Sequence, residues 1–212
     1  MYTHTRETQA SMTPQIALTV LREGNARFQA NLKANRNLLQ QVNETRAGQW
    51  PFAIVLSCID SRTSVELLFD QGLGDVFSAR IAGNFVNDDI LGCMEFACHL
   101  AGSKLIVVLG HSHCGAIKGA CDDVKLGHLT GLIDKLKPAV SSAAANCPGP
   151  HNSANADFVQ AVARTNVERT VADIKNRSEV LRTMLEQGEI GIAGGMYDVE
   201  TGSVEFFAPT VG

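Results

Sequence analysis

Two short apolar runs, each followed at once by polar residues of metal-binding type, constrain this chain most strongly. Residues 52–57 (FAIVLS) precede Cys-Ile-Asp-Ser-Arg at 58–62, and residues 105–109 (LIVVL) precede Gly-His-Ser-His-Cys at 110–114. Apolar runs of this length, rich in β-branched residues, are typical of strands that are buried on both faces. The sequence therefore predicts two strands of a parallel sheet that present metal-binding side chains at their carboxyl ends, where open α/β sheets place their chemistry.

Elsewhere, segments of strand-like composition alternate with segments of helical periodicity. The expected strands are 52–57, 76–82, 104–110, 190–197 and 204–207, and the expected helices are 14–33, 65–69, 90–100, 114–121, 126–145 and two within 155–187. Alternation of this kind favours a parallel sheet with right-handed crossovers, and a final hairpin adds an antiparallel strand. We therefore expect an α/β fold with a mostly parallel central sheet of four strands plus an antiparallel edge strand, flanked by helices.

The N-terminal part is expected to form a helical arm beside this sheet. Residues 1–12 are polar and are expected to be flexible, and they lack the apolar core of a secretory signal. Thr13, followed by proline, is a good N-cap for the helix expected over 14–33. Residues 34–50 are mostly polar and are expected to be connective.

Composition narrows the class of protein. A chain of 212 residues without repeats or linkers is expected to form a single domain over 1–212. A net charge of −4 without a basic stripe argues against nucleic acid as a partner, and no apolar run approaches the ~20 residues of a membrane span. Six cysteines in a chain too large to need disulfides fit a reducing, cytoplasmic location.

Cys58, His111 and Cys114 are ligand types that zinc prefers, and a catalytic zinc site keeps a fourth position open. A His-x-x-Cys pair alone is a weak signal, but its combination with Cys-x-Asp-x-Arg on a second strand end is much more specific. Asp60 and Arg62 beside the first ligand indicate a site for hydrolysis or hydration. The alternative is a core histidine and two core cysteines, with a structural ion pair between Asp60 and Arg62.

These two motifs resemble the signatures of the β-class carbonic anhydrases, zinc enzymes that interconvert carbon dioxide and bicarbonate. The resemblance covers nearly the whole chain, from the N-terminal helix to the Gly-Gly-Met-Tyr-Asp segment near its end. It implies Zn²⁺ as cofactor, with carbon dioxide or bicarbonate as substrate. Carried over to this chain, the zinc ligands and the paired residues beside the metal are Cys58, His111, Cys114, Asp60 and Arg62.

The resemblance implies that zinc-bound hydroxide adds to carbon dioxide, because zinc lowers the pKa of its bound water. Two thiolates neutralise the ion's charge, so we expect a higher water pKa than at a zinc site with three histidines. Asp60 either orients this hydroxide or becomes the fourth ligand of a closed site. A bidentate pair with Arg62 would hold it off the metal, so we expect an open site at neutral pH.

Two further positions bear on this choice. Family members with an inhibitory bicarbonate pocket carry a tryptophan three residues before the first cysteine, where this chain has Val55. The difference favours the open, plant-like form, whereas Tyr197 is weak evidence for the closed one.

Gln49 falls where plant-like members carry a glutamine that hydrogen-bonds the substrate. The family forms dimers or larger assemblies, so we expect a homodimer or homotetramer in which Gln49 reaches a neighbour's zinc.

Some roles stay open. His113 is a candidate proton shuttle, although a histidine beside a ligand is more often structural. Phe77, Phe85 and Leu91 are candidates for an apolar substrate pocket, although core packing is the commoner role for each of them taken alone. Two other functions suit the same ligands: hydrolysis of carbonyl sulfide or carbon disulfide on this scaffold, and a non-catalytic zinc-binding sensor.

Overall fold

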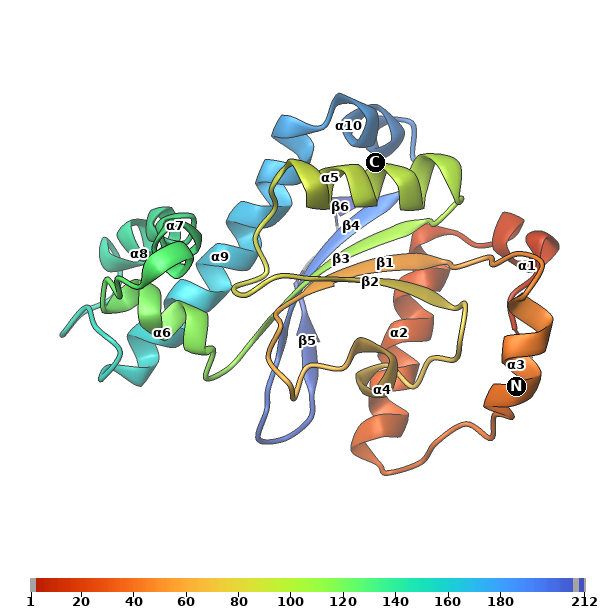
Figure 1. The fold of residues 1–212 in the computed structure, drawn as a ribbon, viewed down its shortest axis with the longest axis horizontal. Helices are drawn as coiled ribbons and strands as arrows, with labels where there is room; N and C mark the ends of the chain where they lie inside the picture. Colours follow the sequence, from red (N-terminus) through yellow and green to blue (C-terminus); the bar gives the residue numbers. More distant parts are fainter. Residues whose placement is uncertain (1–2, 208–209, 212) are drawn as a thin grey trace.

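One sheet runs through the middle of the molecule (Figure 1), which is described here from a computed structural model for residues 3–207 and 210–211. Its strands are β1 (Ala53–Ser57), β2 (Val76–Arg80), β3 (Leu105–His111), β4 (Gly191–Tyr197), β5 (Val204–Phe206) and β6 (Thr210–Val211). The order β2-β1-β3-β4 is parallel throughout, and β5 and β6 both pair with β4 in antiparallel fashion. The expected four parallel strands and antiparallel edge strand are confirmed, and β6 is an addition that the sequence did not indicate.

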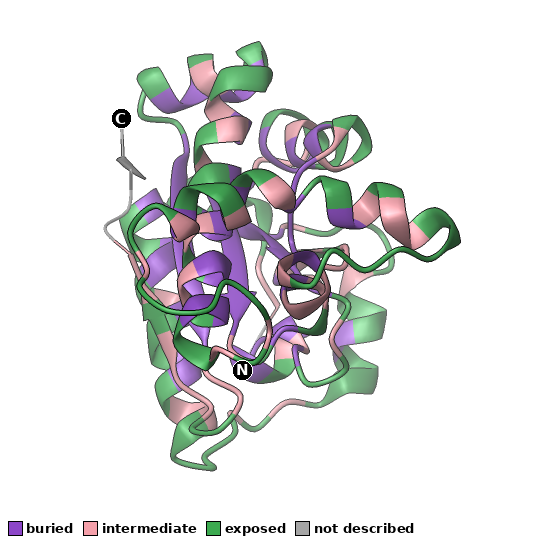
Figure 2. Cartoon of the chain, turned by 90° about the vertical axis from the view of Figure 1, so that its left-hand side faces the viewer, coloured by how far each residue is buried: buried purple, intermediate pink, exposed green. Residues whose placement is uncertain are grey.

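Helices cover both faces of the sheet, so the buried strands lie between helices whose outer surfaces are exposed (Figure 2). The helices are α1 (Arg6–Ala10), α2 (Pro14–Gln29), α3 (Leu38–Thr45), α4 (Val65–Leu68), α5 (Asp88–Glu95), α6 (Gly115–Cys121), α7 (Gly127–Asp134), α8 (Lys137–Ala144), α9 (Ala156–Arg177) and α10 (Glu179–Glu186). A π-helical turn, Phe96–Leu100, extends α5. No helix in the described part of the chain is both long and apolar enough to cross a membrane.

The sheet separates two apolar cores because successive side chains of a strand point to opposite faces. Ile54 and Leu56 of β1 pack in the core beneath α9, whereas Ala53 and Val55 pack in the core beneath α2. Every residue of β1, β3 and β4 is buried. Burial on both faces is the physical reason that these strands read as continuous apolar runs.

Helix α9 lies directly against the backbone of the sheet. A Cβ atom on Gly110 would lie 2.7 Å from a methyl carbon of Val167, and one on Gly194 would lie 2.9 Å from the other methyl carbon. Only glycine leaves room for Val167 at these two positions, so β3 and β4 together fix the place of α9. The buried face of this helix therefore has a defined position relative to the strand ends.

The N-terminal segment differs from the expectation of a flexible arm. Within residues 3–12, Thr5 caps α1, and the buried amide of Gln9 donates hydrogen bonds of 2.8 Å to the carbonyls of Pro51 and Ala101. These bonds tie α1 to the start of β1. The next helix, α2, begins after its N-cap Thr13 as expected but ends at Gln29, short of the expected residue 33.

Two other helical segments differ in detail. The connective stretch expected over 34–50 contains α3, which Asn37 caps by accepting a hydrogen bond from the Gln40 amide. The single helix expected over 126–145 is divided into α7 and α8. Pro138 lies in the first turn of α8, and a proline lacks the N–H needed to continue an existing helix, so a second helix begins there.

We expect Asn25→Ala to lower the free energy of unfolding by about 2–4 kcal/mol, because it leaves buried backbone groups without their hydrogen-bond partner. Asn25 of α2 is buried, donates to the carbonyls of Leu68 and Gly202, and accepts from the Val204 amide at 2.8 Å. Urea unfolding measures the loss. The control is Asn43→Ala, since the one hydrogen bond described for the exposed Asn43 side chain is to the Leu39 carbonyl within α3, and its cost should stay below about 0.5 kcal/mol. Equal losses in the two variants would contradict the prediction.

Candidate metal centre

Three side chains of metal-binding type converge at the carboxyl edge of the sheet. Cys58 directly follows β1, His111 is the last residue of β3, and Cys114 is the N-cap of α6. Strands β1 and β3 are parallel neighbours with Ser57 opposite Leu109, so their ends lie together. The two sulfur atoms and an imidazole nitrogen all lie within 4.8 Å of one another, and all three residues are buried.

The imidazole of His111 is oriented as a ligand. Its Nδ1 lies 2.8 Å from the carbonyl oxygen of Ser112, which can only accept, so Nδ1 carries the proton and donates it. Nε2 is then an unprotonated acceptor, and it is buried without a hydrogen-bond partner in the described part of the chain. Leaving such an atom unpaired is costly, and a bound metal ion is the partner that removes the cost.

The two thiols complete a soft donor set. Their sulfur atoms lie 3.9 Å apart, and the Gly83 amide donates to Sγ of Cys58 at 3.4 Å. A hydrogen bond from Cys114 lowers the pKa of Cys58, whereas that bond and burial raise the pKa of Cys114. No fourth cysteine or histidine joins the cluster within the residues described, so the set suits zinc with one position left for another ligand.

Asp60 and Arg62 form a bidentate ion pair beside this cluster. Nε of Arg62 donates to Oδ1 of Asp60 at 2.9 Å, and Nη2 donates to Oδ2 at 2.8 Å. Oδ2 also lies 3.9 Å from Nε2 of His111. The hydrogen bonds from Arg62 hold the pKa of Asp60 well below its usual range, and Asp60 raises the pKa of Arg62. The carboxylate is therefore charged at neutral pH and is held in place next to the ligands.

Arg80, at the end of β2, is a residue of this site that the sequence reasoning missed. Its Nε donates to the carbonyl of Cys58 at 3.0 Å, and its Nη2 donates to the carbonyl of Asp60 at 2.7 Å. These two hydrogen bonds hold the loop that carries Cys58 and Asp60. The signal in the sequence was a single charged residue, Arg80, within the otherwise uncharged strand expected over 76–82.

A cavity of about 370 Å³ opens beside Cys58 and Asp60. Apart from these two residues, its lining is small or aliphatic and comes from the loop after β1, the turn after β2, and the region of α6 and α7: Ile59, Ala82, Gly115, Ala116, Gly119, Val124, Leu129 and Ile133. The candidate pocket residues Phe85 and Leu91 lie in the core instead, and Phe77 lines a separate cavity at the β2 edge. The space beside the ligands therefore suits a small apolar molecule.

Among the residues described, the remaining candidates do not belong to the three-residue cluster. Gln49 is exposed in the loop before β1, next to Gly74, and so lies at the opposite end of this strand from Cys58. The exposed ring of His113 lies 3.0 Å from a carboxylate oxygen of Glu200. Val55 is buried on the α2 face, and Tyr197 is buried at the end of β4 opposite His111.

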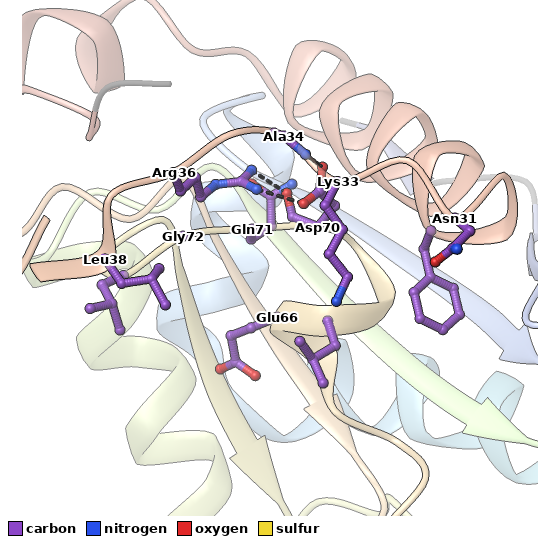
Figure 3. Close-up of a pocket in the computed structure, with 12 residues that line it drawn as sticks. Asn31, Lys33, Ala34, Arg36, Leu38, Glu66, Asp70, Gln71 and Gly72 are labelled. Atoms are coloured by element: carbon purple, nitrogen blue, oxygen red, sulfur yellow. Dashed lines mark hydrogen bonds and ion pairs between the residues drawn. The ribbon is translucent and has the colours of Figure 1, made fainter.

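A larger cavity of about 510 Å³ lies between the segment after α2 and helix α4 (Figure 3). Asp70 lines it, forms ion pairs with Arg27 and Arg36, and accepts a hydrogen bond from the Ala34 amide. None of the three metal-ligand candidates lines it. The ion pairs tie the chain after α2 to the end of α4, which is a structural role.

Comparison with known proteins agrees with this geometry. The carbonic anhydrase family profile matches residues 53–204. A carbonic anhydrase of Mycolicibacterium smegmatis is 34% identical over 199 residues, which covers 91% of this chain and 92% of that protein.

Two solved structures share the fold. The β-carbonic anhydrase of Coccomyxa, in complex with acetazolamide, is 28% identical with a TM-score of 0.70, and the match covers 80% of this chain and 78% of that one. A tetrameric β-carbonic anhydrase of Sordaria macrospora matches with a TM-score of 0.69 at 22% identity, over 81% of this chain and 92% of that one. The profile match over residues 53–204 and the 34% identical relative together establish that this chain belongs to the carbonic anhydrase family, in its β class.

Proposed function

We propose that this protein catalyses the reversible hydration of carbon dioxide to bicarbonate and a proton, with zinc held by Cys58, His111 and Cys114. The observation that carries the proposal is the convergence of two thiols and an unprotonated imidazole nitrogen within 4.8 Å. Membership of the carbonic anhydrase family supports the reaction. The apolar cavity beside the ligands supports a small nonpolar substrate.

When bound, zinc supplies hydroxide near neutral pH by lowering the pKa of its water. Held by Arg62, the ionised carboxylate of Asp60 would accept a hydrogen bond from the hydroxide that the metal supplies and would fix its direction toward the substrate. Arg62 engages both carboxylate oxygens, which supports the proposal that Asp60 stays off the metal at neutral pH. Apart from Cys58 and Asp60, the side chains that line the cavity are small or aliphatic, which supports a nonpolar substrate such as carbon dioxide.

Each of the six cysteines is a free thiol. Unpaired cysteines are usual where glutathione and thioredoxin keep thiols reduced. Reduced thiols are also required for Cys58 and Cys114 to bind zinc as thiolates. We therefore include a cytoplasmic location in the proposal.

Stopped-flow measurement between about pH 6.5 and 9 tests the reaction directly. We expect the zinc-loaded protein to hydrate carbon dioxide at a rate that rises with pH through a single ionisation. Cys114→Ser should lose both tightly bound zinc and activity, because the soft donor set is broken. Cys147→Ser is the matched control, since the only hydrogen bond described for its thiol is to the Pro148 carbonyl. It should keep both properties.

A zinc-loaded protein without turnover over this pH range would contradict the proposal. The same preparation is then assayed for sulfide release from carbonyl sulfide. Release of sulfide would assign the related hydrolase activity. No turnover of either substrate would leave the non-catalytic zinc-binding role.

Arg62→Ala tests whether the ion pair keeps Asp60 off the metal. We expect the freed carboxylate to become a fourth ligand, so activity at neutral pH should fall by about 10-fold or more, as for other residues that orient metal ligands. The absorption spectrum of the cobalt-substituted variant should show four protein ligands at pH 7. Arg169→Ala, which removes an exposed arginine of α9, is the control and should leave the spectrum unchanged. Four protein ligands in the wild-type spectrum would contradict the open site.

Assembly is part of the proposal, because Gln49 lies at the far end of β1 from its own chain's ligands. The tetrameric Sordaria macrospora relative supports an oligomer. We propose a homodimer or homotetramer in which Gln49 of one subunit hydrogen-bonds the substrate of another.

Mixing two inactive variants tests this arrangement. A dimer of one Cys58→Ser chain and one Gln49→Ala chain contains one site with both native residues if Gln49 acts across the interface. We expect the refolded equimolar mixture to regain about a quarter of wild-type activity per chain, since half of the dimers are mixed and each has one intact site. Each variant refolded alone is the control. A mixture no more active than the average of the two variants would show that Gln49 does not act across subunits.

A further inference from the structure

We propose that Asn166, in the middle of α9, is a positioning residue for the metal ligand Cys58 and acts through the turn at 81–84. The inference rests on the proposed metal site, because it assigns a role toward one of its ligands. Asn166 is 108 residues from Cys58 in the sequence, and the two residues belong to different elements. They are connected by one glycine.

The connection consists of two buried hydrogen bonds. Nδ2 of Asn166 donates to the carbonyl oxygen of Gly83 at 2.7 Å, and the Gly83 amide donates to Sγ of Cys58 at 3.4 Å. Asn166 is 4% exposed. Gly83 therefore accepts a hydrogen bond from α9 through its carbonyl and donates one to the Cys58 sulfur through its amide.

The turn that carries Gly83 has little freedom to move. The Ile81 amide donates to the Ser57 carbonyl at 3.1 Å, and the Asn84 amide donates back to the Ile81 carbonyl at 2.9 Å. Gly83 has a φ of 81°, which favours glycine, and a Cβ atom there would lie 2.7 Å from a methyl carbon of Leu136. Packing thus closes one side of the turn, and the amide of Asn166 holds its carbonyl.

An asparagine at this place needs an explanation, because the buried face of α9 is otherwise mostly apolar. Burying a side-chain amide is unfavourable unless it is hydrogen-bonded. The hydrogen bond to the Gly83 carbonyl offsets part of the cost of burying the Asn166 amide. The same bond also fixes the direction of a residue whose N–H donates to a metal-binding sulfur, and partners of this kind orient ligands and tune the metal. Ala82 of this turn lines the cavity beside the candidate metal centre, so the turn contributes both to the cavity wall and to the position of Cys58.

Metal binding tests the proposal independently of catalysis. Zinc affinity is measured by competition with a chelator, and the sulfur-to-cobalt charge-transfer band is recorded for the cobalt form. We expect Asn166→Ala to bind zinc about 10- to 100-fold more weakly and to shift this band. Asn166→Ser, which keeps a shorter donor, should lie between the wild type and the alanine variant.

Asn25→Ala is the matched control. Asn25 is also a buried asparagine on a helix that donates to backbone carbonyls, but it lies on the other face of the sheet. It should lower thermal stability and leave zinc affinity and the cobalt band unchanged. A folded Asn166→Ala variant whose zinc affinity is within about twofold of the wild type and whose band is unshifted would overturn the proposal, since outer partners of metal ligands ordinarily cost more.

A measurement on the unaltered protein covers the case in which neither Asn166 variant folds. With ¹¹³Cd in place of zinc, the hydrogen bond to the ligand sulfur should produce scalar coupling between the Gly83 amide and the metal. Absence of that coupling would overturn the inference. Tight zinc binding without carbon dioxide hydration by the wild type would end the proposed function alone, because neither readout depends on turnover.

Discussion

The parallel pairing of β1 with β3 is the constraint on which the rest of the molecule depends. It sets Ser57 beside Leu109, so the residues after these positions leave the sheet at the same edge. Both strands are buried on both faces, and a shift of register by one residue would exchange the two cores and separate Cys58 from His111. The metal centre is therefore a consequence of strand register, and the short loops after the strands only complete it.

The loop that carries Cys58 and Asp60 is held from two directions. Arg80 on β2 binds its carbonyls, while the turn after β2 reaches the Cys58 sulfur and is itself bonded to Asn166. Glycines 110 and 194 allow α9 to lie close enough for that last contact, because any larger residue would displace Val167. The bonds from Arg80, the turn after β2 and the close packing of α9 thus all act on the position of Cys58.

The sequence predicted the parts of this structure that have local signals. Runs of β-branched residues marked the strands, and the spacing of His111 and Cys114 marked the convergence of ligands that the geometry shows. It failed where the signal is a partner far along the chain. Residues 3–12 were expected to be flexible because they are polar, but Gln9 ties them to carbonyls more than 40 residues away, and no local pattern indicates such a contact. Arg80 and Asn166 likewise act on partners far along the chain, and the proposed site of action of Gln49 would lie on a second chain.

The separation of the ligands along the chain also couples metal uptake to folding. In an unfolded chain only His111 and Cys114 are near each other, and Cys58 is separated from them by two successive crossovers, through α4 to β2 and through α5 to β3. A three-ligand site exists only after both crossovers have formed, so the proposed zinc ion would bind the native state far more tightly than the unfolded one. Each tenfold excess of free zinc over its dissociation constant then adds about 1.4 kcal/mol to the free energy of unfolding. On the proposed zinc site, the supply of the metal would therefore set the stability of the fold as well as the occupancy of the site.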